Sequence, residues 1–287
     1  MLKRFALVLL ACFVISGCGS VEQKLAVEQE QVQSSEVQKP SEEVVPEEDT
    51  KPIEVETPTE EVQPEEIPTD STDDQPAESK KLVVIDPGHQ RRGNSAKEPV
   101  GPGATETKAK VTGGTQGTTT GIPEYQLTLQ VSFKLGAELE KRGYAVLYTR
   151  TTHDVDISNS ERAAIANTAN ADAFIRIHAN GSTNAAVSGA MTICQTPSNP
   201  YNGDLYTASR ALSGNVLDEL VNATGCRKEY VWETDTMSGI NWCSVPVTIV
   251  EMGYMTNPDE DVALNTESYQ DKIVQGIANG IDRTLIK

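Results

Sequence analysis

Short apolar runs recur along the C-terminal two thirds of the chain, each bounded by polar or turn-forming residues. Runs of this length that contain many β-branched residues indicate strands buried on both faces of a sheet. The pattern therefore predicts strands at 82–85, 144–148, 174–177, 189–194 and 247–250.

Between these runs lie longer segments with helical spacing. Residues 124–142 place Leu127, Val131, Leu135 and Leu139 four positions apart, which suits a helix. Every second residue from Leu127 to Phe133 is also apolar, which would suit a strand. Length, the Glu and Lys content and Gly143 at the end favour a helix.

Three further helices follow from similar patterns. The sequence Ser158-Asn159-Ser160-Glu161 is a capping box, which starts a helix that we expect to reach Ala169. Apolar residues share one face at 206–221 and again at 269–286. Two stretches lack such periods: 225–244 is expected to be a loop or hairpin, and 90–121 a loop or flap over a site.

Strands that alternate with helices predict an α/β fold. We expect a single three-layer domain at 81–287, with a mainly parallel or mixed sheet between helices. No internal repeat is visible.

The first 18 residues have the features of a bacterial export signal. Lys3 and Arg4 precede an apolar run that is too short for a permanent membrane span, and the run ends at Ser16-Gly17-Cys18. Small residues before a cysteine resemble a lipoprotein lipobox, which implies cleavage before Cys18 and lipidation of that residue. An ordinary signal peptide with a chance cysteine is the alternative.

Residues 19–80 have the composition of a disordered tether. They are rich in Pro and Glu and contain no aromatic residue, so they cannot build a core. The chain's net charge of −18 divides into +2 for residues 1–20, −15 for residues 21–80 and −5 for residues 81–287. The folded part shows no basic stripe, so nucleic acid is not expected as a partner.

Three of the predicted strands end in side chains suited to metal binding or proton transfer. His89 follows the first run after Pro87-Gly88, and His178 and Glu251 directly end two others. In open α/β sheets such ends gather at one edge and form the ligand site. Glu124, at the start of a predicted helix, is a further carboxylate.

Two histidines and a carboxylate predict a catalytic zinc site with one position left for water. Glu124 and Glu251 are then available for two roles, one as ligand and one in proton transfer. The third histidine, His153, lies in a polar run and is expected to be an exposed loop residue. Asp86 is expected to be a turn residue or to orient His89.

At these residues the chain resembles a known family, the zinc-dependent N-acetylmuramoyl-L-alanine amidases of the Amidase_3 type. The match covers 82–286. It is carried by four motifs: Asp86-Pro87-Gly88-His89, Glu124 at a helix start, Ile177-His178-Ala179-Asn180 and the residues from Val250 to Asn257.

The resemblance implies that His89, Glu124 and His178 bind one Zn²⁺ and that Glu251 is the catalytic acid and base. It also implies cleavage of the amide between N-acetylmuramic acid and L-alanine in peptidoglycan. Asn180 would line the substrate site. The protein would then be exported and lipid-anchored to a bacterial membrane, facing the cell wall; protein partners are not indicated.

Three departures from the family bear on the substrate site. Gln90-Arg91 stands where the family often has Gly-Gly, and Arg176 stands where many members have Ser. Arg176 is therefore a second candidate lining residue. The segment from His89 to Glu124 is also longer than in many members.

Three other functions remain open at this point. The first is a zinc peptidase acting on stem peptides. The second is a non-catalytic wall-binding domain with the same fold, although all four site residues are retained. The third is a lipid-anchored solute-binding protein, for which the mature region is short.

Three cysteines, Cys194, Cys226 and Cys243, follow the lipobox. Cys226 and Cys243 flank a Trp-containing segment and could pair across it. A core of about 200 residues needs no covalent staple, which favours three reduced thiols.

Overall fold

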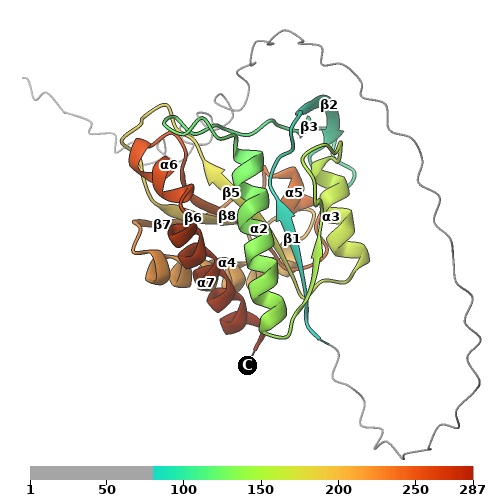
Figure 1. Ribbon diagram of the computed structural model, residues 1–287. Helices are drawn as coiled ribbons and strands as arrows, with labels where there is room; N and C mark the ends of the chain where they lie inside the picture. Colours follow the sequence, from blue (N-terminus) through green and yellow to red (C-terminus); the bar gives the residue numbers. More distant parts are fainter. Residues whose placement is uncertain (1–79, 287) are drawn as a thin grey trace, which may run out of the picture. The chain divides into compact units, whose positions relative to one another are not determined.

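The computed structural model describes residues 80–286 (Figure 1). The predicted signal, Cys18 and the acidic segment up to Ser79 lie outside these residues. None of the helices in 80–286 is both long and apolar enough to span a bilayer.

The described part contains eight strands and six α-helices, with one short 3₁₀ helix, η1 (Gly203–Leu205). The strands are β1 (Leu82–Pro87), β2 (Asn94–Pro99), β3 (Thr107–Val111), β4 (Ala145–Tyr148), β5 (Ala173–Asn180), β6 (Ala190–Cys194), β7 (Lys228–Glu233) and β8 (Val247–Tyr254). The helices are α2 (Glu124–Lys141), α3 (Asn159–Thr168), α4 (Tyr206–Thr224), α5 (Ser238–Asn241), α6 (Pro258–Leu264) and α7 (Glu267–Leu285).

Six strands form one mixed sheet in the order β4-β1-β5-β8-β6-β7. The strands β4, β1, β5 and β8 are parallel, whereas β6 runs antiparallel to β8 and pairs in parallel with β7. The carboxyl ends of β1, β5 and β8 therefore meet at one edge. The predicted α/β fold with a mixed sheet is confirmed.

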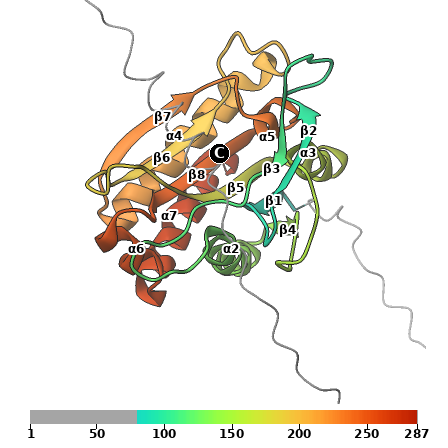
Figure 2. The ribbon, with the colours of Figure 1, turned by 90° about the horizontal axis from the view of Figure 1, so that it is seen from above.

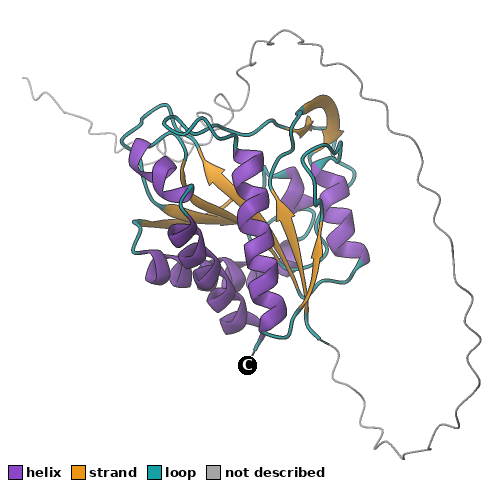
Figure 3. Ribbon diagram, in the orientation of Figure 1, coloured by secondary structure: helices purple, strands orange, loops and turns teal. Residues whose placement is uncertain are grey.

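Helices cover both faces of this sheet (Figures 2 and 3). One face packs against α2, α4 and α7, and the other against α3 and α5. Alternate residues of β1 divide between them: Val83 and Ile85 enter the first core, and Val84 enters the second.

Segment 124–142, whose apolar residues fitted both a helix and a strand, is a helix. The burial of its side chains explains why both patterns were present. The four residues spaced by four, Leu127 to Leu139, are fully buried against the sheet. Phe133, which contributed to the alternating pattern, is 42% exposed on the outer side of α2. The helical period thus follows the buried face, as the leucine spacing predicted.

The expectation of a loop or hairpin at 225–244 is wrong. Residues 228–233 form β7, an edge strand that joins the main sheet beside β6, and 238–241 form the short helix α5. A hairpin would pair neighbouring antiparallel strands, whereas β7 reaches β6 in parallel after the crossover helix α4.

The long segment after His89 is ordered. Strands β2 and β3 pair as an antiparallel hairpin, and 112–122 then runs back to the start of α2. We call residues 112–122 the strap. The cysteines Cys194, Cys226 and Cys243 are free, which confirms the expectation of reduced thiols.

Candidate metal centre

The predicted ligand residues meet at the carboxyl edge of the sheet. His89 follows β1, His178 lies near the end of β5, and Glu124 is the first residue of α2. His89 Nε2 lies 3.1 Å from Glu124 Oε1. His178 Nδ1 lies 3.1 Å from His89 Nε2 and 3.2 Å from Glu124 Oε1.

This triangle suits a tetrahedral metal ion. Zinc bonds of about 2.0–2.2 Å at tetrahedral angles place two ligand atoms about 3.3 Å apart. All three residues are largely shielded from solvent, and their ligand atoms form a cluster that can hold a metal ion. A cation at the centre would give all three atoms one common partner.

His89 is oriented by a backbone carbonyl. Its Nδ1 lies 2.9 Å from the carbonyl oxygen of Thr112 in the strap, which assigns the ring proton to Nδ1. Nε2 then keeps its lone pair for a metal. Asp86, which was expected to be a turn residue or to orient His89, does not contact the ring, because its carboxylate binds Arg162, Arg176 and Thr149.

Glu124 is held in place by backbone N–H groups. Thr115 N donates to Oε2 at 2.9 Å, and Ala179 N donates to Oε1 at 3.0 Å. Burial acts to raise the pKa of Glu124, but His89 and His178 outweigh burial and hold that pKa well below its usual range. The carboxylate is therefore ionised and ready to bind a cation.

His178 is kept neutral by its surroundings. Burial and the neighbouring His89 lower its pKa to about 4, against the raising effect of Glu124. A neutral imidazole is the form that binds metal. Gly88 permits this packing, since a Cβ there would lie 2.6 Å from His178 Nε2.

Glu251 lies on β8, directly beside His178 on β5 in the strand register. Its Oε2 is buried and has no hydrogen-bond partner among the described residues. Burial and the Glu124 charge raise the pKa of Glu251 well above its usual range, although Arg176 opposes the shift. A buried carboxyl group with a raised pKa beside a ligand cluster is a candidate for proton transfer.

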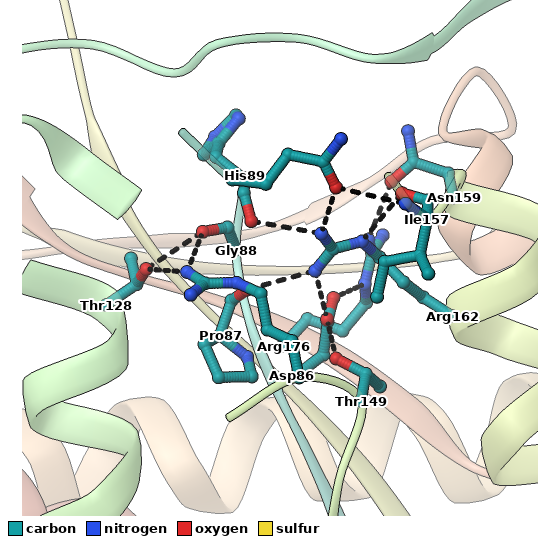
Figure 4. A network of polar contacts seen from close by, with 12 residues as sticks. Asp86, Pro87, Gly88, His89, Thr128, Thr149, Ile157, Asn159, Arg162 and Arg176 are labelled. Atoms are coloured by element: carbon teal, nitrogen blue, oxygen red, sulfur yellow. Dashed lines mark hydrogen bonds and ion pairs between the residues drawn. The ribbon is translucent and has the colours of Figure 1, made fainter. Parts of the chain in front are cut away.

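A buried network of polar side chains supports the backbone at His89 (Figure 4). Asp86 is fully buried and forms ion pairs with Arg162 at 2.7 Å and with Arg176 at 2.8 Å. Arg162 Nη2 also donates to the His89 carbonyl oxygen at 3.0 Å. Asp86 thus acts on His89 through Arg162.

This network holds His89 in an unusual conformation. The φ angle of His89 is +61°, in a region that residues other than glycine adopt rarely and at some cost. The carbonyl oxygen of Gly88 accepts hydrogen bonds from Thr128 at 2.8 Å and from Arg150 at 3.0 Å. These contacts fix the turn that carries His89 from β1 into the site.

The remaining predicted site residues fare differently. Arg176 is only 4% exposed, and its guanidinium binds Asp86 and Asn159, so its predicted place at a substrate surface is wrong. Asn180 lies at the end of β5, near the cluster, and its Oδ1 accepts from Gly181 N at 2.8 Å. Its role as a lining residue stays a prediction.

His153 is in a loop, as expected, but it is not fully exposed. Its ring packs edge-on against Tyr125 with centroids 5.2 Å apart, and its Nδ1 is buried without a hydrogen-bond partner among the described residues. Burial, Arg150 and Arg91 lower the pKa of His153.

The strap lies in the segment that was expected to be a loop or flap over a site, but the sequence did not reveal that it holds two of the ligands. It contacts two ligands, through Thr112 and Thr115, and is fastened at its other end to α6. There the buried Asp261 accepts hydrogen bonds from the backbone N–H groups of Thr119 and Thr120, both at 2.7 Å. The only sequence signal was the unusual length of the segment.

Comparison with known proteins agrees with this geometry. Residues 83–283 match the family model of the N-acetylmuramoyl-L-alanine amidases, Amidase_3. The uncharacterised Bacillus subtilis protein YqiI is 32% identical over 162 residues, which cover 56% of this chain and 74% of that protein. The germination-specific N-acetylmuramoyl-L-alanine amidase of Bacillus subtilis is 25% identical over 224 residues, covering 71% and 80% of the two chains.

A solved structure supports the same conclusion. The amidase Ami1 from Mycobacterium smegmatis superposes with a TM-score of 0.64 at 25% identity, over 71% of this chain and 96% of that one. Because the family model spans nearly all the described residues, the chain belongs to the N-acetylmuramoyl-L-alanine amidase family, Amidase_3.

Proposed function

We propose that this chain hydrolyses the amide between N-acetylmuramic acid and L-alanine in peptidoglycan with one Zn²⁺ held by His89, Glu124 and His178. Family membership supports the amidase activity and the wall substrate. The ligand triangle supports the metal, and its two imidazole nitrogens and one carboxylate oxygen suit zinc.

A zinc ion bound there would supply Lewis acidity, which polarises a carbonyl group and makes water a better nucleophile near neutral pH. The protein's own contribution is orientation. Backbone groups of Thr112 and Thr115 fix the orientations of the His89 ring and the Glu124 carboxylate, and burial keeps His178 neutral.

Glu251 would move the protons. Its carboxylate accepts a proton from the attacking water, and the carboxyl group then gives that proton to the nitrogen of L-alanine as the C–N bond breaks. The products are a free lactyl carboxylate on the sugar and a free amine on the peptide. Burial and the Glu124 charge raise the pKa of Glu251, which favours uptake of the water proton in the first step.

The observation that carries this proposal is the mutual distance of 3.1–3.2 Å among three ligand atoms beside Glu251. The test is digestion of peptidoglycan by the purified chain, with and without a chelator and after zinc is restored. Mass spectrometry should find intact stem peptides with a free L-alanine amine. Cuts within the stem would instead indicate a peptidase.

Glu251→Gln isolates the proton-transfer role. The variant should bind zinc as tightly as the wild type and lose activity by about 10²–10⁴-fold, the usual contribution of general acid–base catalysis. Glu267→Gln is the matched control, because Glu267 is an exposed residue of α7. Full activity of Glu251→Gln would remove Glu251 from the mechanism.

The proposal includes the site of action. The lipobox resemblance at Cys18 supports a lipid anchor, and the acidic segment after it would let the folded domain reach the wall. In a bacterial host that lipidates proteins, the wild-type chain should label with a fatty acid and sediment with membranes. Cys18→Ser should do neither; a labelled Cys18→Ser chain would refute the anchor.

A further inference from the structure

A shallow pocket of about 300 Å³ is not used by the mechanism above. It is lined by residues from two loops, the turn after β1 and the loop after β4. Those residues are Arg91, Arg92, His153, Asp154 and Val155.

The turn that carries the two arginines is held firmly. Gln90 is fully buried, and its side chain donates to the Arg92 carbonyl oxygen at 3.1 Å and accepts from Arg162 at 3.0 Å. Arg91 N donates to the His153 carbonyl oxygen at 3.0 Å, which ties the two loops together. The backbone is therefore fixed, while the Arg91 side chain is 52% exposed.

The charge of the pocket favours an anion. Arg91 pairs with Asp154 at 3.2 Å, but both groups are exposed, and exposed pairs contribute little. Arg92 is exposed and forms no ion pair with any described residue. The pocket thus has a spare guanidinium, although the chain as a whole carries a net charge of −18.

Two of the lining residues connect the pocket to the segments that carry the ligands. Arg91 is two residues from His89, so their Cα atoms are at most about 7.6 Å apart. His153 packs against Tyr125, which directly follows Glu124. The lining of the pocket is therefore tied to the segments that carry His89 and Glu124.

We propose that the pocket binds a carboxylate of the peptidoglycan stem peptide, with Arg92 as its main partner and Arg91 as a second. This specificity site rests on the proposed function. Guanidinium groups bind carboxylates with paired, directional hydrogen bonds. In peptidoglycan the residue after L-alanine is a D-glutamate whose carboxylate is free in some walls and amidated in others, so the pocket would distinguish the two.

The test compares two substrates with the zinc-loaded full chain. Both contain N-acetylmuramic acid linked to L-alanine, one with a free glutamate carboxylate and one with the amide in its place. Arg92→Glu should raise KM for the free acid by about tenfold or more, with kcat unchanged. It should change KM for the amidated substrate less than twofold.

Two further variants guard against a general loss of structure. Arg283→Ala removes an equally exposed arginine from α7 and should change neither substrate's KM. Asp154→Asn removes the competing carboxylate and should lower KM for the free acid about twofold to threefold, a gain that misfolding cannot produce.

The outcomes separate this inference from the proposed function. If the wild type cleaves neither substrate, the proposed function fails. If it cleaves both, and Arg92→Glu changes both KM values equally or changes neither, the carboxylate site is refuted.

Discussion

The two faces of the central sheet are built in different ways. The face toward α2, α4 and α7 is a continuous apolar core, to which β1 contributes Val83 and Ile85. The face toward α3 and α5 has a smaller apolar core and, next to it, the buried charges Asp86, Arg162 and Arg176. Arg162 is only 1% exposed.

This difference indicates that the two faces contribute differently to the stability of the fold and to the geometry of the site. An apolar core stabilises in proportion to buried area and carries little directional information. The charged network costs desolvation but directs hydrogen bonds to the carbonyl groups of Pro87 and His89. We therefore expect the first face to set stability and the second to set both stability and the geometry of the metal centre.

The largest effect should come from Asp86→Ala. Loss of this carboxylate leaves Arg162 and Arg176 buried without their partner, which costs about 3–5 kcal/mol of unfolding free energy. It also leaves Arg162 without the carboxylate that positions it, which weakens the hydrogen bond from Arg162 to the His89 carbonyl oxygen. Zinc affinity should therefore fall. Urea unfolding of the metal-free chain and competition with a chromophoric chelator measure the two effects. Unchanged zinc affinity would contradict the assigned role of this face.

Leu135→Ala tests the opposite face. This residue of α2 is fully buried in the apolar core, and its truncation should cost about 2–5 kcal/mol. Because Leu135 contacts no ligand, zinc affinity under folding conditions should stay within about twofold of the wild-type value. A parallel drop in affinity would show that the two faces do not divide these roles.

The pH dependence of stability sharpens the comparison. Burial acts to raise the pKa of Asp86, but Arg162, Arg176 and Thr149 hold it far below its usual range. Because the pKa of Asp86 is lower in the folded chain than in the unfolded chain, where it is near 4, the ionised carboxylate stabilises the fold at pH values above about 4. This stabilisation is lost as the pH falls further. The unfolding free energies of metal-free wild type and Asp86→Asn should differ by a constant amount from pH 5 to 7. Below about pH 4 they should converge by up to about 1.4 kcal/mol per pH unit. For Leu135→Ala the difference from wild type should not depend on pH.

The smallest effect should come from the strap, which belongs to neither face. Asp261→Asn weakens the anchor at Thr119 and Thr120, and should cost about 1 kcal/mol and lower zinc affinity about fivefold through Thr112 and Thr115. Asp259→Asn is the matched control, since Asp259 is an exposed acidic residue of the same helix. Equal zinc affinities for the two variants would show that the strap does not orient the ligands.

Much of the molecule follows from local pattern. The apolar runs identified five strands of the sheet, and the spacing of four leucine and valine positions identified α2. The motifs predicted His89, Glu124, His178 and Glu251 as site residues, because a metal-binding side chain at a strand end or a helix start is a local feature of the sequence.

The sequence by itself therefore determined the α/β fold and predicted four site residues, of which the structure brings His89, Glu124 and His178 together. Only the tertiary structure decided that β7 joins β6, that Arg176 is buried, and that Thr112 orients the ring of His89 while Asp86 acts on its backbone through Arg162. The physical reason is that these outcomes depend on which groups meet across long sequence separations. A backbone carbonyl such as that of Thr112 has the same chemistry at every residue, so its partner is fixed by where the chain passes.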